Sequence, residues 1–180
     1  MKRAWWIGFA GLACIAVSLL LYRHLHAAEE VKGLKHVSSS FEFEINAPLE
    51  KAFPLFGADK EQSWAPGWEP EFIHPSPAED IPGAVFSVRH SHHKSVWINT
   101  AFDQPNGHVQ YAYFIPDVLV TIIDIHLTQL ANGHTHAHVT YERTALNYDV
   151  NDIVIKHGEA DAKSGPEWQK QINDYLQKGS

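Results

Sequence analysis

Apolar and polar residues alternate most regularly between residues 117 and 146, which predicts the longest hairpin of the chain. Its two halves, residues 118–130 and 135–146, are rich in β-branched side chains, and Ala131-Asn132-Gly133-His134 separates them. An Asn-Gly pair between strand-like runs is typical of a hairpin turn. In each half one side of the strand is apolar and the other is polar. We therefore expect one face to lie in the core and the other to contact water.

The register of this hairpin depends on the length of its loop. A two-residue loop places Leu127 opposite His138 and so mixes the apolar and polar faces. A three-residue loop, with Gly133 in the left-handed conformation, pairs Leu127 with Val139 and keeps each face uniform. We therefore predict the three-residue loop. In that register the outer face carries Asp124, His126, His136, His138 and Glu142.

Shorter strands are predicted before this hairpin. Alternation of apolar and polar residues indicates strands over residues 41–45, 84–90, 95–102 and 109–115. Together with the hairpin they give about six to seven antiparallel strands. Because helical patterns surround this run of strands, the sequence predicts an α+β domain with helices on one face of a single sheet.

Helices are predicted at both ends of the run of strands. After Asn46, which we expect to be an N-cap, apolar residues follow at helical spacing, but Pro54 limits them to a short or kinked helix. A later helix is expected from Asp149 or Asn151, and another from Ser164 or Gly165. The last one carries an apolar residue every fourth position, at Trp168, Ile172 and Leu176.

Residues 1–28 have the pattern of a targeting segment. Lys2 and Arg3 precede an uncharged apolar run, residues 4–22. The run is longer than a usual signal-peptide core of about 7–15 residues and close to the roughly 20 residues that span a bilayer. It predicts a signal anchor that contacts the membrane, or else a cleaved signal peptide. We expect an exported domain, anchored on the periplasmic side of the inner membrane or secreted if the leader is removed.

Charge and cysteine content exclude several classes of function. Residues 29–180 carry 11 basic and 21 acidic side chains, which would repel a phosphate backbone, so no nucleic acid partner is expected. Cys14 is the only cysteine, so neither an internal disulfide nor a cysteine nucleophile is available to the domain.

Residues 29–38 are predicted to be a polar tether and residues 39–178 one folded domain.

Several short motifs resemble the START-like SRPBCC superfamily, and its polyketide cyclase/dehydrase-like branch is the nearest match. They are the Trp64-x-x-x-Trp68 turn, Pro82-Gly83-Ala84-Val85-Phe86, residues 139–146 and the late Trp168 with Tyr175-Leu176. The resemblance covers roughly residues 38–176. It implies a helix-grip fold, in which a curved antiparallel sheet wraps a long C-terminal helix around an apolar cavity. Members bind lipids, sterols, polyketides or plant hormones, or act as cyclases, dehydratases or oxygenase subunits. We find no ligand set for a cofactor and expect none.

Ten aromatic side chains are candidates for the wall of such a cavity. Aromatic rings supply apolar area, and Tyr and Trp add a polar tip that can orient a ligand. The same residues could instead fill a core without a ligand. We expect Trp64 and Trp68 at the cavity mouth. The candidates are Phe53, Phe56, Trp64, Trp68, Phe86, Trp97, Tyr111, Tyr113, Tyr141 and Trp168.

Polar residues of the hairpin are weaker candidates for chemistry. His134, His136 and His138 lie at alternate positions about 7 Å apart, a spacing that could serve zinc, but an exposed strand face is the more ordinary interpretation. Asp124 and His126 could act as acid and base if they pointed inward beside Arg143. On an outer face their separation of about 7 Å would be too long for a direct hydrogen bond.

The sequence therefore predicts an exported domain that binds a small apolar or amphipathic ligand in an internal cavity. One alternative is a cyclase- or dehydratase-type enzyme that polarises a carbonyl substrate. Another is an interaction module with a filled core and no ligand.

Overall fold

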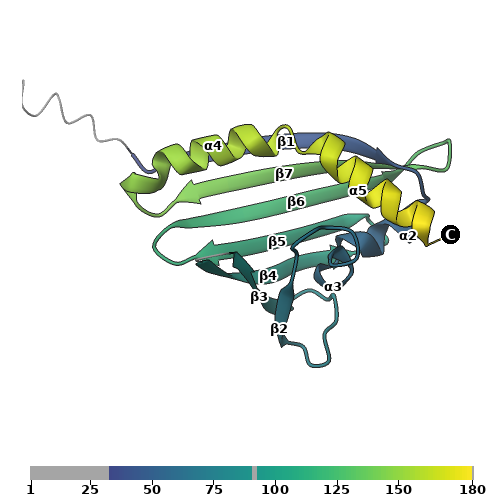
Figure 1. Cartoon of the computed structure of the whole chain (residues 1–180), viewed down its shortest axis with the longest axis horizontal. Coiled ribbons are helices and arrows are strands. Elements are labelled where there is room, and N and C mark those ends of the chain that lie inside the picture. The colour runs from purple at the N-terminus through teal and green to yellow at the C-terminus, as the bar shows by residue number, and fades with distance from the viewer. Residues whose placement is uncertain (1–32, 91–92, 180) are drawn as a thin grey trace, which may run out of the picture. The chain divides into compact units, whose positions relative to one another are not determined.

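An antiparallel sheet of seven strands dominates the computed structural model, which describes residues 33–90 and 93–179 (Figure 1). Its order is β1-β7-β6-β5-β4-β3-β2. The chain therefore passes from one edge of the sheet to the other between β1 and β2, and β1 pairs with β7. Each of the other strands pairs with its neighbours in the chain. The strands are β1 (His36–Ile45), β2 (Pro70–His74), β3 (Val85–His90), β4 (His93–Asp103), β5 (His108–Ile115), β6 (Leu119–Gln129) and β7 (Thr135–Ala145).

The helices lie over one face of the sheet (Figure 1). α4 packs on β1 and β7, and α5 packs on β1. This arrangement confirms the α+β helix-grip fold, with the C-terminal helix in two parts. The helices are α2 (Leu49–Ala52), the 3-10 turn η1 (Phe53–Phe56), α3 (Ala58–Glu61), the 3-10 turn η2 (Tyr148–Val150), α4 (Asn151–Asp161) and α5 (Gly165–Lys178).

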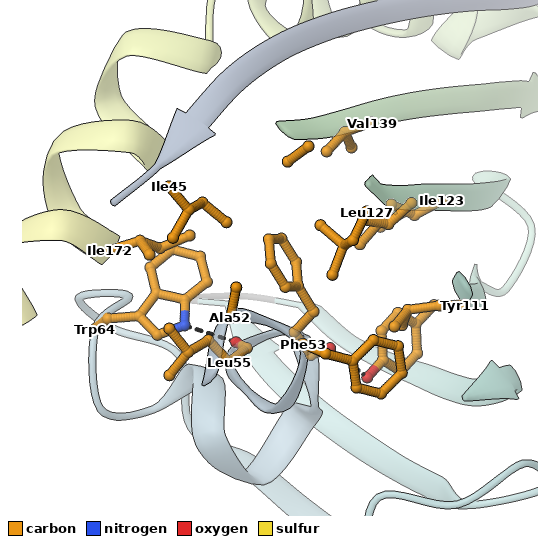
Figure 2. Close-up of a cluster of buried hydrophobic side chains, with 14 of the residues drawn as sticks. Ile45, Ala52, Phe53, Leu55, Trp64, Tyr111, Ile123, Leu127, Val139 and Ile172 are labelled. Atoms are coloured by element: carbon orange, nitrogen blue, oxygen red, sulfur yellow. Dashed lines mark hydrogen bonds between the residues drawn. The ribbon is translucent and has the colours of Figure 1, made fainter. Parts of the chain in front are cut away.

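The main core lies between the sheet, the η1 turn and α5 (Figure 2). Ile45, Phe53, Val139 and Ile172 are fully buried in it. The faces of the long hairpin are as predicted: Ile123, Ile125 and Leu127 are buried, whereas His126 is exposed. Burial of these apolar side chains is the main favourable term that holds the sheet against the helices.

The predicted register of the hairpin is wrong by two residues. Leu127 lies opposite Ala137, and Val139 lies opposite Ile125. The loop does have three residues, but they are 131–133, because the Leu130 amide donates to the His134 carbonyl at 2.8 Å. Gly133 has a φ of 86°, so it does supply the left-handed position. A shift of two residues leaves each side chain on its predicted face.

Four other elements differ from the prediction. β2 and α3 were not predicted, since each is short and lacks a clear period. β1 begins at His36, inside the predicted tether, because its first residues bond to β7; Ser38 Oγ, for example, donates to Glu142 at 2.6 Å. Asn46 is not the N-cap of α2, a position that Pro48 occupies. The Asn46 amide instead donates to Asn173 Oδ1 of α5 at 2.9 Å.

The predicted apolar segment, residues 4–22, lies outside the described residues. Across residues 33–90 and 93–179, none of the helices has both the length and the apolar character that a membrane span requires.

Candidate functional site

A pocket of about 430 Å³ lies between the sheet and α4. β4, β5 and β7 form its floor, and the last two turns of α4 form its roof. Its apolar part consists of Trp97, Ile115 and Ala160, and its polar groups belong to Ser95, Tyr113, Arg143, His157 and Asp161.

Trp97 and Tyr113 form one wall of the pocket. They face each other across β4 and β5, and their rings stack at 4.2 Å with an interplanar angle of 22°. The Trp97 indole nitrogen donates to Ser95 Oγ at 2.7 Å, and Ser95 Oγ donates to the Val88 carbonyl at 3.2 Å. These bonds fix the plane of the indole, so the wall is rigid and pre-formed.

Arg143 is the polar centre of the pocket. It is only 6% exposed and makes a bidentate ion pair with Asp161 of α4, at 2.6 and 2.9 Å. Its Nη1 donates to Tyr113 Oη and, at 3.2 Å, to Thr121 Oγ1. Because an unpaired charge in the interior is costly, Asp161 ties the end of α4 to β7 through this pair.

The charges of this pair shift the pKa values of their neighbours. Burial, and then the Asp161 charge, raise the pKa of the Tyr141 hydroxyl well above its usual value. Burial, and then the Arg143 charge, lower the pKa of His157. His157 is therefore neutral at pH 7, and its imidazole can accept or donate a hydrogen bond inside the pocket.

Glu61, at the end of α3, is a second unusual carboxyl group. Burial, together with the nearby Asp80 charge, raises its pKa to about 8. The Glu61 charge in turn contributes to the raised pKa of the Tyr111 hydroxyl, after burial and Asp80. Tyr111 Oη donates to the Phe56 carbonyl at 2.9 Å. Glu61 is half-buried, and with this pKa it is mostly protonated at neutral pH.

The ten predicted cavity residues lie in three places. Trp97 and Tyr113 line the pocket under α4. Trp64 and Trp68 lie along a shallow depression of about 340 Å³ formed by residues 62–69. The Trp64 indole donates to the Leu55 carbonyl at 2.7 Å (Figure 2), and the Trp68 indole donates to the Ala58 carbonyl at 2.8 Å. The remaining six pack in or against the main core, to which these four residues also belong: Phe53, Phe56, Phe86, Tyr111, Tyr141 and Trp168.

The three predicted acid–base candidates are not brought together. Arg143 faces the pocket, whereas Asp124 and His126 lie on the outer face of the sheet. The expectation that Asp124 and His126 are too far apart for a hydrogen bond is wrong, because His126 Nε2 lies 3.1 Å from Asp124 Oδ2. The side chains of residues two apart can lean toward each other. His108 of β5, which was not predicted, contacts the other oxygen of Asp124 at 2.7 Å.

The predicted histidine series, in which His134 precedes β7 and His136 and His138 lie on it, does not converge on one point. His134 contacts Glu44, and His136 and His138 contact Glu42 at 3.1 and 3.4 Å. The hydrogen bonds from His136 and His138 hold the pKa of Glu42 below its usual range. These exposed imidazoles pair with carboxylates of β1 rather than with one another.

Sequence reasoning missed four polar groups of these sites: Ser95, His157, Asp161 and Glu61. Asp161 and His157 lie on a helix whose sequence is mainly polar, and only the packing of α4 on β7 brings them to Arg143. A charged residue such as Glu61 in a short helix is normally solvated, so no local signal marks it as half-buried.

Comparison with known proteins identifies the fold. No protein-family model and no curated protein sequence matches this chain. Among solved structures, a protein of unknown function from Staphylococcus aureus, SA2116, matches with a TM-score of 0.61 at 11% identity. The match covers 82% of this chain and 97% of SA2116. Norcoclaurine synthase from Thalictrum flavum, in complex with dopamine and hydroxybenzaldehyde, matches with a TM-score of 0.59 at 12% identity. The match covers 82% of this chain and 90% of the synthase chain. Ara h 8.0201 matches with a TM-score of 0.58 at 18% identity, and the match covers 80% of this chain and 99% of Ara h 8.0201.

Proposed function

Because the chain has a START-like helix-grip fold, we propose that it binds a small aromatic or amphipathic molecule in the pocket under α4. The observation that carries the proposal is the pocket itself, in which the Trp97–Tyr113 wall faces the Arg143–Asp161 pair. Its volume of about 430 Å³ falls in the range of roughly 300–1,000 Å³ that is usual for small-molecule sites.

Binding is driven by removal of apolar ligand surface from water. Trp97, Ile115 and Ala160 give the ligand an apolar surface. The Trp97 indole stacks on Tyr113 on one side and on Phe86 on the other, so a ligand ring meets its edge in a T-shaped contact. Such an aromatic pair contributes about 0.5–1.5 kcal/mol beyond the buried area. The preferred ligand therefore has an aromatic or otherwise flat apolar body.

The polar end of the pocket favours a neutral group over a strong anion. Asp161 already neutralises the Arg143 charge through two hydrogen bonds. A ligand carboxylate would have to compete with Asp161, whereas a hydroxyl or carbonyl group can bond to Tyr113 or His157 without breaking the pair. The ligand class is thus a small phenol, ketone or similar amphipathic molecule. The same fold accommodates dopamine and hydroxybenzaldehyde in norcoclaurine synthase.

A cyclase- or dehydratase-type enzyme is the second candidate function, and His157 favours it. His157 has a lowered pKa and lines the same pocket as Tyr113 and Arg143. The imidazole could accept a proton while Tyr113 polarises a carbonyl. If so, His157→Ala removes turnover of a bound carbonyl compound but leaves its affinity within about threefold.

We also propose that the domain works outside the cytoplasm. The support is the order of Lys2 and Arg3 before the apolar residues 4–22. Fusion of a periplasmic reporter enzyme after residue 180 tests this, since the reporter is active only if the chain is exported.

Native mass spectrometry of the purified chain, followed by solvent extraction, tests the binding function. We expect a small molecule of defined mass to co-purify, or an added uncharged aromatic probe such as N-phenyl-1-naphthylamine to bind at one site. Ala160→Phe fills the pocket and should weaken probe binding at least about tenfold. The matched control is Ala162→Phe, two residues away and outside the pocket lining, which should bind normally. Equal binding by both variants would contradict the proposed site.

A further inference from the structure

The outer face of the sheet, opposite the pocket, carries a compact group of three metal-ligating side chains. We propose that His108, Asp124 and His126 form a site for one divalent transition-metal ion. Within the described part of the chain, this is the only set of three His, Cys, Asp or Glu residues whose ligand atoms all lie within 4.8 Å of one another.

The register of two neighbouring strands creates the site. His108 of β5 lies directly opposite His126 of β6, so both side chains leave the sheet on the same face. Their rings are parallel to within 6° and their centroids are 4.7 Å apart. Asp124 precedes His126 by two residues and therefore points to the same side.

The carboxylate of Asp124 brings both imidazoles to one point. Its Oδ1 lies 2.7 Å from His108 Nε2, and its Oδ2 lies 3.1 Å from His126 Nε2. Two ligand atoms on one tetrahedral zinc ion, each at about 2.0–2.1 Å from the metal, are roughly 3.4 Å apart. The contacts of Asp124 with the two imidazoles therefore differ from that spacing by less than an ångström, and the two parallel rings have to tilt toward each other to share one ion. Each imidazole would bind the metal through the Nε2 lone pair as the neutral tautomer, with its one proton on Nδ1 after exchange through solvent.

A second layer of hydrogen bonds holds the carboxylate in place. Gln110, which lies opposite Asp124, donates from Nε2 to Asp124 Oδ1 at 3.0 Å. Thr100 in turn donates to Gln110 Oε1 at 2.9 Å. Such support of a ligating carboxylate is typical of metal sites and separates this group from a chance meeting of mobile side chains.

The donor set selects the class of metal. Two imidazole nitrogens and one carboxylate oxygen suit zinc, copper, nickel or cobalt, and they do not suit calcium or magnesium, which prefer oxygen ligands. Asp124 and His108 have side chains 30% and 29% exposed, and that of His126 is 55% exposed. The site is open to solvent on one side, so water completes the coordination. Its role is to link β5 to β6 rather than to act on the ligand in the pocket.

The neighbouring imidazoles provide the control. His136 pairs with Glu42 at 3.1 Å on the same outer face, but it belongs to no cluster of three ligand atoms among the described residues. Loss of His136 therefore removes an exposed histidine from the same sheet face without removing a ligand of the proposed site.

Isothermal titration of the full chain with ZnCl₂ tests the proposal, with the variants His108→Ala, Asp124→Asn and His126→Ala beside the control His136→Ala. Circular dichroism checks that each variant is folded. We expect each of the three variants to lose one equivalent of bound zinc, or to bind that equivalent at least about tenfold more weakly. The control should keep it. Zinc should also raise the melting temperature of the control more than that of Asp124→Asn, because binding to the folded state stabilises it.

Two results would overturn the proposal. One is equal zinc binding by the unmodified chain and all three ligand variants, which would assign the binding to other histidines. The other is equal loss in His136→Ala, which would indicate a diffuse attraction to the histidine-rich face. CoCl₂ gives an independent readout, since coordination by these ligands should produce visible absorption bands in the control that are missing in His108→Ala.

Discussion

Arg143 shows how a single side chain organises the pocket. It points to the inner face from β7 and is held by Asp161, Tyr113 and Thr121. Its guanidinium also lies 4.7 Å from the centre of the Tyr141 ring. The bidentate bond fixes the position of α4 relative to the sheet, and the stem of Arg143 covers the end of the aromatic core.

Replacing Arg143 by Leu should destabilise the fold because Asp161 is left as an unpaired, mostly buried charge. Breaking a buried ion pair on one side costs about 3–5 kcal/mol. Urea denaturation should therefore show a lower free energy of unfolding for Arg143→Leu. The double variant Arg143→Leu/Asp161→Leu should recover most of the loss. A single variant within about 0.5 kcal/mol of the unmodified protein, the usual scatter for surface positions, would mean that the pair is solvated.

Glu61 should make stability depend on pH. Its pKa is about 8 in the folded state and near the usual value of 4.5 in the unfolded chain. The folded state therefore retains a proton that the unfolded state loses, so this stabilisation is complete below pH 4.5 and is lost as the pH rises to about 8. The slope is at most about 1.4 kcal/mol per pH unit.

Glu61→Gln removes this titration without changing the size of the side chain. The variant should gain stability relative to the unmodified protein as the pH rises from 5 to 8, and the difference should level off above pH 8. Urea denaturation at several pH values measures it, with Glu159→Gln, an exposed residue of α4, as the control. A constant difference across this range would show that Glu61 ionises normally.

At the scale of elements, α4 lies very close to β1. A Cβ atom on Gly158 would lie 2.5 Å from Cγ1 of Val37. Gly158→Ala should therefore destabilise the fold, because overpacking costs about 1–3 kcal/mol and exceeds the gain in helix propensity of about 1 kcal/mol. In a Val37→Ala background the same change should become stabilising. Thermal denaturation of the unmodified protein, the two single variants and the double variant tests this reversal of sign. An equal loss of stability from Gly158→Ala in both backgrounds would contradict the close contact.

The long hairpin shows which parts of the fold the sequence could predict. Alternation assigned the inner and outer faces of β6 and β7 correctly, because burial acts on every second residue. The register was wrong because loops beginning at 131 and at 132 both keep the faces uniform. Only the Leu130–His134 bond decides between them. β2 was missed because a five-residue edge strand that starts with Pro70 has too few positions for a pattern to emerge.

The pocket could be predicted only in part, for a different physical reason. Trp97, Tyr113 and Arg143 lie on regular strands, so their common face follows from alternation. His157 and Asp161 join them only because α4 packs over β7, and no local pattern encodes that contact. The outer cluster was missed in the same way: Asp124 and His126 were noted, but His108 joins them through the pairing of β5 with β6.

At the scale of the whole domain, the sheet separates two polar sites. Trp97, Tyr113 and Arg143 face α4, while His108, Asp124 and His126 point to the opposite side. Coupling between them would require a second arrangement of the packed strands that separate the sites. Zinc should therefore change the affinity for a pocket ligand by less than about twofold, as a probe titration with and without ZnCl₂ would show. A tenfold change, about 1.4 kcal/mol of coupling, would contradict this independence.

The measurement that tests the central claim most directly is an NMR titration of the tryptophan indole N–H signals with an uncharged aromatic probe such as N-phenyl-1-naphthylamine. The Trp97 indole bonds to Ser95 within the pocket, whereas the Trp64 indole bonds to the Leu55 carbonyl beside the core. Trp97→Phe and Trp64→Phe assign the two signals. Our account predicts a saturable shift of the Trp97 signal while the Trp64 signal stays unchanged. A saturable shift of Trp64 with an unchanged Trp97 would place the ligand elsewhere and contradict it.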